Sequence, residues 1–197
     1  QEIVDVIKAI NKEKNEWDIC GYLDDDPNKQ GKEIDGIKVI GTINDFDYGD
    51  DIWVVNALGN PNSFFVRKRV VDTLPPVNYA TLIHPSTYVS EKCVIDEGTV
   101  IFPYCAISPK VNIGKHVLLF PNVTVAHDTK IGDYVTLTSG VKISGNNKIE
   151  EGVYVGTNAT IVNHVNIKKW SLVGAGSLVA QNIKEYSFVL GNPGRVI

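Results

Sequence analysis

The stretch VNIGKHVLLFPNVTVAHDTKIGDYVTL, residues 111–137, places an aliphatic side chain at every sixth position. The spacing continues without a slip from residue 83 to residue 179. An α-helix cannot keep a six-residue period on one face, and a flat strand alternates at two. The period predicts a parallel β-helix in which each hexapeptide forms one flat side. Its 17 positions are Ile83, Val89, Ile95, Ile101, Ile107, Ile113, Leu119, Val125, Ile131, Leu137, Ile143, Ile149, Val155, Ile161, Ile167, Val173 and Val179.

Three flat sides close one coil, so the repeats predict roughly six coils stacked ~4.8 Å apart. The aliphatic position should fill the interior, with a second and often smaller side chain four residues later packed beside it. Glycines follow an interior position directly and suit tight corners; they are Gly114, Gly132, Gly156 and Gly174. Prisms of this kind resemble the left-handed β-helices, and the expected handedness comes from that resemblance.

Residues 1–80 follow a different pattern, in which helical and strand-like segments alternate. This alternation predicts a small parallel α/β domain, followed by the β-helix domain over residues 81–197. The expected elements are a helix at QEIVDVIKAINKEKN, a strand at WDICGYL, an acidic turn at DDDPNKQG, a strand at DIWVVNALGN, a helix at NSFFVRKRVVDTL and a strand at NYATLI.

Composition excludes several classes of function. The net charge is −4, which argues against nonspecific binding to nucleic acid. No apolar run approaches the ~18 residues that span a bilayer, so no membrane insertion is expected. The cysteines lack metal-type spacing, and no metal site is predicted. Cys20, Cys93 and Cys105 are interpreted as reduced, buried residues of a cytoplasmic protein.

Four histidines are candidates for chemistry. His84 lies in LIHPS, where the β-helix begins, and is interpreted as structural. His116 and His164 occupy corner positions of their hexapeptides, which predict solvated surface residues.

His127 differs from the other three because Asp128 follows it directly. One coil earlier the equivalent position is Pro109, and one coil later it is Gly145. A glycine stacked over the imidazole would leave room for a ligand, whereas a side chain would fill that room. The spacing alone leaves open whether His127 is a functional base or a satisfied structural residue.

The segment HDTKIGDY lies within the repeats, after an α/β region that contains GYLDDDPNKQGKEIDGIKVIG, and the chain closes on VLGNPGRVI. In these segments, and over nearly its whole length, the chain resembles the bacterial sugar acetyltransferases. That family includes sialic-acid O-acetyltransferases and UDP-4-amino-sugar N-acetyltransferases of the bacillosamine and perosamine pathways. The resemblance implies a homotrimer with acetyl-CoA bound between adjacent β-helices. It also implies a catalytic pair, matched here by His127 as base and Asp128 as its partner.

The chemistry of acetyl transfer suits this pair. An imidazole with an ordinary pKa near 6.5 can accept the proton of an attacking amine or hydroxyl. A neighbouring carboxylate can fix its tautomer and stabilise the imidazolium. Cys93 and Cys105 occupy an inward position of the repeat, so we expect direct transfer without an acyl-enzyme.

The resemblance also places the contacts of acetyl-CoA near Thr136, Gly145, Thr157 and Ala175. In this family the donor is held largely by main-chain groups, which leave little trace in side chains. For Thr136, Thr157 and Ala175, an ordinary corner residue is an equal alternative.

The front half is expected to bind a sugar or nucleotide-sugar acceptor. In the family, a strand with a glycine-rich loop wraps the nucleotide diphosphate, and the matching segment would precede Gln1. Asp24 and Asp25 follow a strand, where carboxylates often bind a ribose or base, although a turn with local Asx bonding explains them equally. Gly59 and Asn60 match the second acceptor loop of the family, and a plain capping turn is the alternative.

The leading interpretation is therefore transfer of acetyl from acetyl-CoA to the amino group of a nucleotide-linked amino sugar. O-acetylation of a sialic acid or related sugar uses the same base and remains open. A noncatalytic hexapeptide scaffold or sugar-nucleotide sensor is the alternative from another class. A Rossmann-type oxidoreductase fits poorly, because no fingerprint loop is visible.

Overall fold

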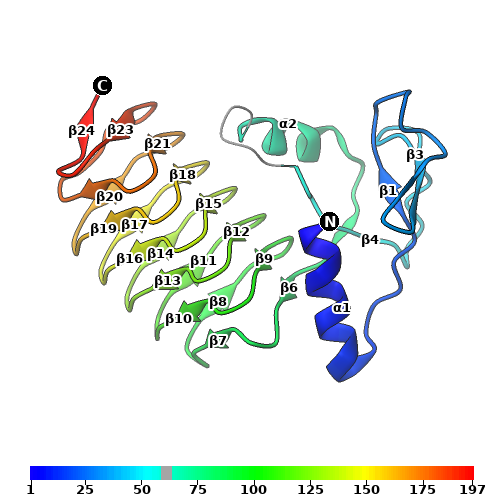
Figure 1. Cartoon of the computed structure of the whole chain (residues 1–197), viewed down its shortest axis with the longest axis horizontal. Coiled ribbons are helices and arrows are strands. Elements are labelled where there is room, and N and C mark those ends of the chain that lie inside the picture. Colours follow the sequence, from blue (N-terminus) through cyan, green and yellow to red (C-terminus); the bar gives the residue numbers. More distant parts are fainter. Residues whose placement is uncertain (59–63) are drawn as a thin grey trace.

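The computed structural model describes residues 1–58 and 64–197, and the larger part is a triangular β-helix (Figure 1). Three sheets form its sides, and up to residue 179 neighbouring strands of each sheet run parallel with an offset of 18 residues, as between Leu118 and Thr136. The second face has six strands, which confirms the expected number of coils.

The first face contains β6 (Leu82–Ile83), β9 (Val100–Ile101), β12 (Leu118–Leu119), β15 (Thr136–Leu137), β18 (Tyr154–Val155), β21 (Leu172–Val173), β23 (Phe188–Leu190) and β24 (Arg195–Val196). The second face contains β7 (Tyr88–Val89), β10 (Ala106–Ile107), β13 (Thr124–Val125), β16 (Lys142–Ile143), β19 (Thr160–Ile161) and β22 (Leu178–Val179). The third face contains β8 (Val94–Ile95), β11 (Asn112–Ile113), β14 (Lys130–Ile131), β17 (Lys148–Ile149) and β20 (Asn166–Ile167). Along the chain, the first corner lies between the first and second faces, the second corner between the second and third, and the third corner between the third face and the next coil.

The interior of the stack follows the six-residue period. From Ile101 to Val179 every sixth side chain is at most 3% exposed. The second interior position is buried too, as at Val117 and Val135. Ile83, Val89 and Ile95 are half-buried because they belong to the first coil, which has a neighbour on one side only. The predicted inward positions are confirmed, and burial of these aliphatic groups is the main stabilising contribution.

The corner glycines have a different role from the expected one. Positive φ angles occur two residues later, at His116 and Tyr134 for example, and not at Gly114 or Gly132. A Cβ on Gly132 would lie 2.8 Å from the backbone nitrogen of Glu151 in the next coil. These glycines are therefore required by the close approach of neighbouring coils rather than by a special backbone conformation.

The front half consists of short elements around two small sheets. They are α1 (Glu2–Lys14), β1 (Tyr22–Leu23), β2 (Glu33–Ile34), β3 (Ile37–Gly41), β4 (Trp53–Val54), α2 (Val66–Thr73) and β5 (Asn78–Tyr79). One sheet has the order β1-β3-β2 and the other pairs β4 with β5. The α/β class followed by a left-handed β-helix is confirmed, whereas the division of the chain at residue 80 stays a prediction.

Three details of the front half differ from the expectation. The strand expected at residues 17–23 forms only at its last two residues. The strand expected at residues 78–83 is divided, because β5 pairs with β4 while β6 pairs with β9 of the β-helix. The antiparallel hairpin β2–β3 was not anticipated, although the Asp35-Gly36 turn, with φ angles of 50° and 82°, is a strong hairpin signal.

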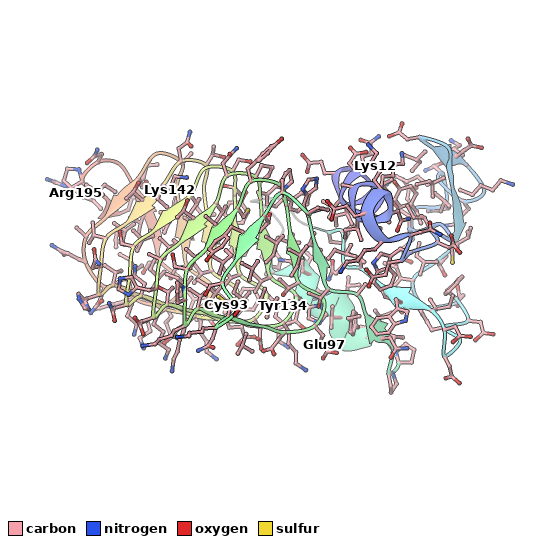
Figure 2. The ribbon with its side chains drawn as sticks, turned by 90° about the horizontal axis from the view of Figure 1, so that it is seen from below. Lys12, Cys93, Glu97, Tyr134, Lys142 and Arg195 are labelled. Carbon is pink, nitrogen blue, oxygen red and sulfur yellow. The ribbon has the colours of Figure 1, made fainter. Side chains whose placement is uncertain are left out.

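Both helices of the front half lie against the β-helix. Val6 and Ile10 of α1 pack on Leu82 and Val100 of the first face. Figure 1 shows the coils stacked in chain order from β6, beside α1, to the β23–β24 hairpin at the far end, and Figure 2 shows Arg195 at that end and Lys12 on the helix beside the other end of the β-helix. Among the described residues, no helix has the length and apolar character needed to cross a membrane.

Candidate active site

His127 lies at the second corner, and the repeat itself directs it outward. Val125 and Thr129 on either side are buried, so the chain must turn between them. Asp128 adopts a positive φ of 57°, and its amide donates to the carbonyl of Pro109 in the preceding coil (3.3 Å). The carbonyl of His127 accepts from the amide of Asn146 in the next coil (2.9 Å). Hydrogen bonds to both neighbouring coils thus fix the backbone of this pair.

The side chains of His127 and Asp128 contact each other at this corner. Nδ1 of His127 lies 2.8 Å from Oδ2 of Asp128, and the side chains are 57% and 41% exposed. The hydrogen bond with His127 lowers the pKa of Asp128, and Lys110, whose Nζ lies 3.7 Å from Oδ1, acts in the same direction. The carboxylate is therefore ionised at neutral pH. A carboxylate at this distance favours the tautomer of His127 with its hydrogen on Nδ1.

Gly145 lies against this imidazole, but not as expected. A Cβ on Gly145 would lie 2.9 Å from both Cε1 and Nε2 of His127. The room that the glycine leaves is therefore taken by the His127 ring itself, and the expectation of free space for a ligand was wrong. A contact between Gly145 and acetyl-CoA stays a prediction.

The other residues expected near acetyl-CoA do not gather around His127. Thr157 and Ala175 lie at the first corner, are exposed, and follow one another in adjacent coils. Thr136 lies on the first face, where it is 3% exposed and its Oγ1 accepts a hydrogen bond from Arg67 Nη1 (3.0 Å). Within one chain, Thr136, Thr157 and Ala175 therefore lie away from the corner of His127. Their roles in binding acetyl-CoA stay predictions.

The expected acceptor residues of the front half make local contacts. Asp24 Oδ1 accepts from the amide of Asp26 (3.0 Å), and Asp24 Oδ2 lies 2.7 Å from Lys29 Nζ. Asp25 Oδ1 accepts from the amide of Ile43 (2.7 Å). The bond between Asp24 and Asp26 is that of the Asx-turn alternative, whereas Asp25 bonds to a residue 18 positions away, and a role of either carboxylate in acceptor binding stays a prediction. Gly59 and Asn60 lie outside the described residues.

His116 was expected to be a solvated corner residue, and this was wrong. Its side chain is buried, because the ring stacks on Tyr134 (5.0 Å between centroids) and meets the edge of Tyr79 (4.5 Å). Burial, and then the nearby charge of Arg67, lowers the pKa of His116. The pair Gly98 and His116, one coil apart, was the available signal, since a glycine can make room for a ring. His164 is exposed, as expected. Nδ1 of His84 lies 2.8 Å from Oγ of Ser86, which agrees with the structural role expected for His84.

The cysteines agree in part with the expectation. Cys105 is buried, and burial raises its pKa to about 11, so the thiol is a poor nucleophile. Cys93 is half-buried with Sγ 3.1 Å from the carbonyl of Ser108. Cys20 is exposed, which contradicts the expected burial. Within the described ranges, no three His, Cys, Asp or Glu side chains are grouped to hold a metal ion.

Two family models match the sequence. The PglD N-terminal domain matches residues 2–74, and the bacterial transferase hexapeptide (six repeats) matches residues 110–145. The chain thus combines a PglD-type front half with hexapeptide-transferase repeats, and the resemblance to bacterial sugar acetyltransferases is confirmed. No curated protein matches the sequence.

Several solved structures share the fold over almost the whole chain. The acetyltransferase domain of PglB from Neisseria gonorrhoeae is 24% identical with a TM-score of 0.87, and the match covers 100% of this chain and 93% of that one. WeeI from Acinetobacter baumannii is 27% identical with a TM-score of 0.86, with 98% and 94% covered. PerB from Caulobacter crescentus, solved with CoA and GDP-perosamine, is 20% identical with a TM-score of 0.81, with 100% and 91% covered.

Proposed function

We propose that this protein transfers the acetyl group of acetyl-CoA to the amino group of a nucleotide-linked amino sugar. His127 acts as general base and Asp128 orients it. The observation that carries the proposal is the 2.8 Å contact between Nδ1 of His127 and the Asp128 carboxylate, at an exposed corner of a transferase-type β-helix. The relatives support the same class: PglB has been solved with acetyl coenzyme A, and PerB with CoA and GDP-perosamine.

The proposed reaction needs no covalent enzyme intermediate. The amine nitrogen attacks the thioester carbonyl carbon while Nε2 of His127 takes its proton. The C–S bond then breaks, and the departing thiolate receives that proton, so the products are an amide and CoA. General-base assistance of this kind is worth roughly 10²–10⁴-fold in rate, and positioning of the two substrates supplies much of the rest.

The arrangement of the expected acetyl-CoA residues supports a homotrimer as part of the proposal. Thr157 and Ala175 lie at the first corner, whereas His127 lies at the second, with the width of the second face between them. A donor held between two β-helices could touch the first corner of one chain and the second corner of its neighbour. Light scattering coupled to size-exclusion chromatography tests the trimer directly, and a monomer at working concentration would contradict it.

The proposal also places the protein in the cytoplasm, where acetyl-CoA and nucleotide sugars would reach it. Its three thiols form no disulfide in the structure. A reducing compartment maintains this state.

The decisive experiment compares acceptors by mass spectrometry. The protein is incubated with acetyl-CoA and, in separate reactions, a UDP-linked 4-amino sugar, GDP-perosamine and a sialic acid. We expect a nucleotide-linked amino sugar to gain one acetyl group, as an amide that resists mild base. Acetylation of only the sialic acid, as a base-labile ester, would replace the proposal with O-acetylation. No acetylated product from any acceptor would favour a noncatalytic scaffold or sensor.

A further inference from the structure

Arg67 is a fully buried arginine at the junction of the two halves. It is the one described residue of α2 that is completely buried, with 0% exposure. Its guanidinium reaches the third corner and the adjoining first face of the β-helix, where Nη1 donates to the carbonyl of Tyr134 (3.4 Å) and to Thr136 Oγ1 (3.0 Å). Nη2 donates to the carbonyl of His116. Because His116 and Tyr134 belong to consecutive coils, one side chain of α2 is bound to two coils at once.

The charge of Arg67 has no carboxylate partner among the described residues. None of the ion pairs found there includes it, and its Nε has no hydrogen-bond partner. Burial lowers the pKa of Arg67 to about 10, so the group is still charged at neutral pH. A buried cation held only by carbonyls and a hydroxyl is a costly way to join two surfaces, and apolar side chains would do so more cheaply. The property that distinguishes a guanidinium from apolar side chains is the fixed direction of its hydrogen bonds, since each N–H must point at an acceptor.

The contrast with α1 shows what Arg67 adds. Val6 and Ile10 of α1 meet Leu82 and Val100 through aliphatic contacts, which are nondirectional and tolerate small shifts. Arg67 instead fixes α2 by hydrogen bonds of defined geometry. Tyr134 lies along the edge of the stack that faces the front half (Figure 2).

Arg67 is also tied to the sheet of the front half. Asn56, which follows β4 and is 8% exposed, donates from Nδ2 to the carbonyl of Arg67 (3.1 Å). Its Oδ1 accepts from the amide of Leu58 (3.1 Å). Phe64, before α2, packs against Tyr154 with 5.6 Å between ring centroids. A continuous set of contacts therefore runs from the end of β4 through Arg67 to the β-helix.

We propose that Arg67 is a positioning residue, which sets the acceptor-binding front half in register with the β-helix that carries His127. The inference rests on the proposed function, because it assigns the acceptor to one half and the base to the other. Loss of the guanidinium lets α2 shift over the coils, so the front half and the β-helix no longer meet the acceptor together and its binding weakens. The exposed acetyl-CoA positions Thr157 and Ala175 lie at the first corner, away from the guanidinium, so acetyl-CoA binding should change little.

The test compares Arg67→Met with Arg69→Met, a matched control from an exposed position of the same helix. Methionine keeps an apolar stem of similar length and removes every donor. For Arg67→Met we expect KM for the acceptor to rise at least tenfold while KM for acetyl-CoA stays within twofold. Arg69→Met should match the parent in both constants. An unchanged acceptor KM in Arg67→Met, or an equal rise in both constants, would overturn the inference.

Thr136→Val is the milder variant if Arg67→Met does not fold. It removes one acceptor of the guanidinium, and we expect a rise of about threefold in the acceptor KM. A rise in KM for acetyl-CoA alone would show instead that Thr136 contacts the donor, and would count against the positioning role.

Hydrogen exchange separates failure of this inference from failure of the proposed function, because it requires no substrate. Amides of residues 66–73 should exchange faster in Arg67→Met than in Arg69→Met, while those of residues 2–14 should be unchanged. If no acceptor is acetylated by the parent protein, the proposed function fails, and the exchange result still decides whether Arg67 holds α2. Equal exchange of residues 66–73 in the two variants would overturn that role.

Discussion

His116 and His127 use the same packing device in opposite surroundings. Each ring occupies space that a glycine leaves in a neighbouring coil, Gly98 for His116 and Gly145 for His127. His127 is exposed and bonded to a carboxylate, whereas His116 is buried and its Nδ1 has no partner in the described part of the chain. A glycine beside a ring therefore reports close packing between coils, and the surroundings of the ring decide whether it can act as a base.

The surroundings differ because different parts of the chain reach the two corners. At the third corner, α2 brings Arg67 to the carbonyl of His116, and Tyr79 closes over the ring. At the second corner, the ion pairs found in the described part of the chain join Asp128 to His127 and to Lys110, and all three residues belong to the repeat itself. Water and a substrate can therefore reach His127, while His116 is shielded from both.

The sharpest test of this contrast is the loss of each ring's chemistry. His127→Ala should lower kcat by about 10²–10⁴-fold, equivalent to about 3–5 kcal/mol, because it removes the proposed general base. His116→Phe should keep kcat within about threefold. Steady-state kinetics with saturating substrates measures both, and full turnover by His127→Ala would remove the assignment of the base.

The two glycines should respond differently to an added methyl group. Gly98 has a φ of +71°, and a Cβ there would lie 2.7 Å from Cε1 of a ring that cannot move away. Gly98→Ala should therefore lower the free energy of unfolding by at least about 2 kcal/mol. Gly145→Ala meets an exposed ring that can turn aside, so it should cost less stability and lower kcat instead. Urea unfolding and kinetics on both variants test this, and equal destabilisation would contradict it.

Replacement of the carboxylate should have a smaller effect than replacement of the base. Asp128→Asn keeps the shape of the side chain but removes the charge that holds Nδ1 protonated and stabilises the imidazolium. We expect kcat to fall by about tenfold, less than for a buried pair, because solvent screens this exposed contact. A loss as large as that of His127→Ala would mean that Asp128 itself takes part in proton transfer.

The smallest expected effect is on the pH dependence of stability. The pKa of His116 is lowered in the folded state, chiefly by burial and then by Arg67, although Glu97 and Asp133 act in the opposite direction. Below an unfolded-state pKa of about 6.5 the unfolded chain binds more protons than the folded one, so stability should fall as the pH drops from there.

His116→Phe keeps a flat ring against Tyr134 and removes the titrating group. Thermal unfolding between pH 7.5 and pH 5 should therefore show a smaller drop in Tm for this variant than for the parent. Near neutral pH the two should differ by no more than about 1 kcal/mol, because Nδ1, a buried ring nitrogen that Phe lacks, has no partner among the described residues. Identical pH profiles would show that His116 is not the group responsible.

The β-helix could be predicted because its interior is defined by local spacing. Ile113 and Ile131 lie inside for the same reason, and no distant segment is needed to put them there. The front half was harder to predict, because strands such as β1 and β4 are two residues long and acquire their pairing from partners far along the chain. The hydrophobic pattern of two residues is too short to predict a strand, and tertiary contacts decide where such a strand begins and ends.

In the candidate site too, local features could be predicted from the sequence and long-range contacts could not. The His127–Asp128 contact is between adjacent residues and could be proposed from their order. The burial of His116 needs Tyr79 as well as Tyr134, and Tyr79 lies outside the repeats, so the order of the repeat residues does not show that contact. The position of Thr136 beneath α2 was missed for the same reason.

The unbroken six-residue interior also constrains how chains of this kind can change in length. One residue inserted into a strand would send every later aliphatic side chain to the outside, since neighbouring residues of a strand point to opposite faces. A segment of 18 residues, which forms one full coil, can be gained or lost while every remaining coil still packs on the next. The β-helix can therefore lengthen or shorten over evolutionary time only by whole coils, so the length of the molecule changes in steps of one coil.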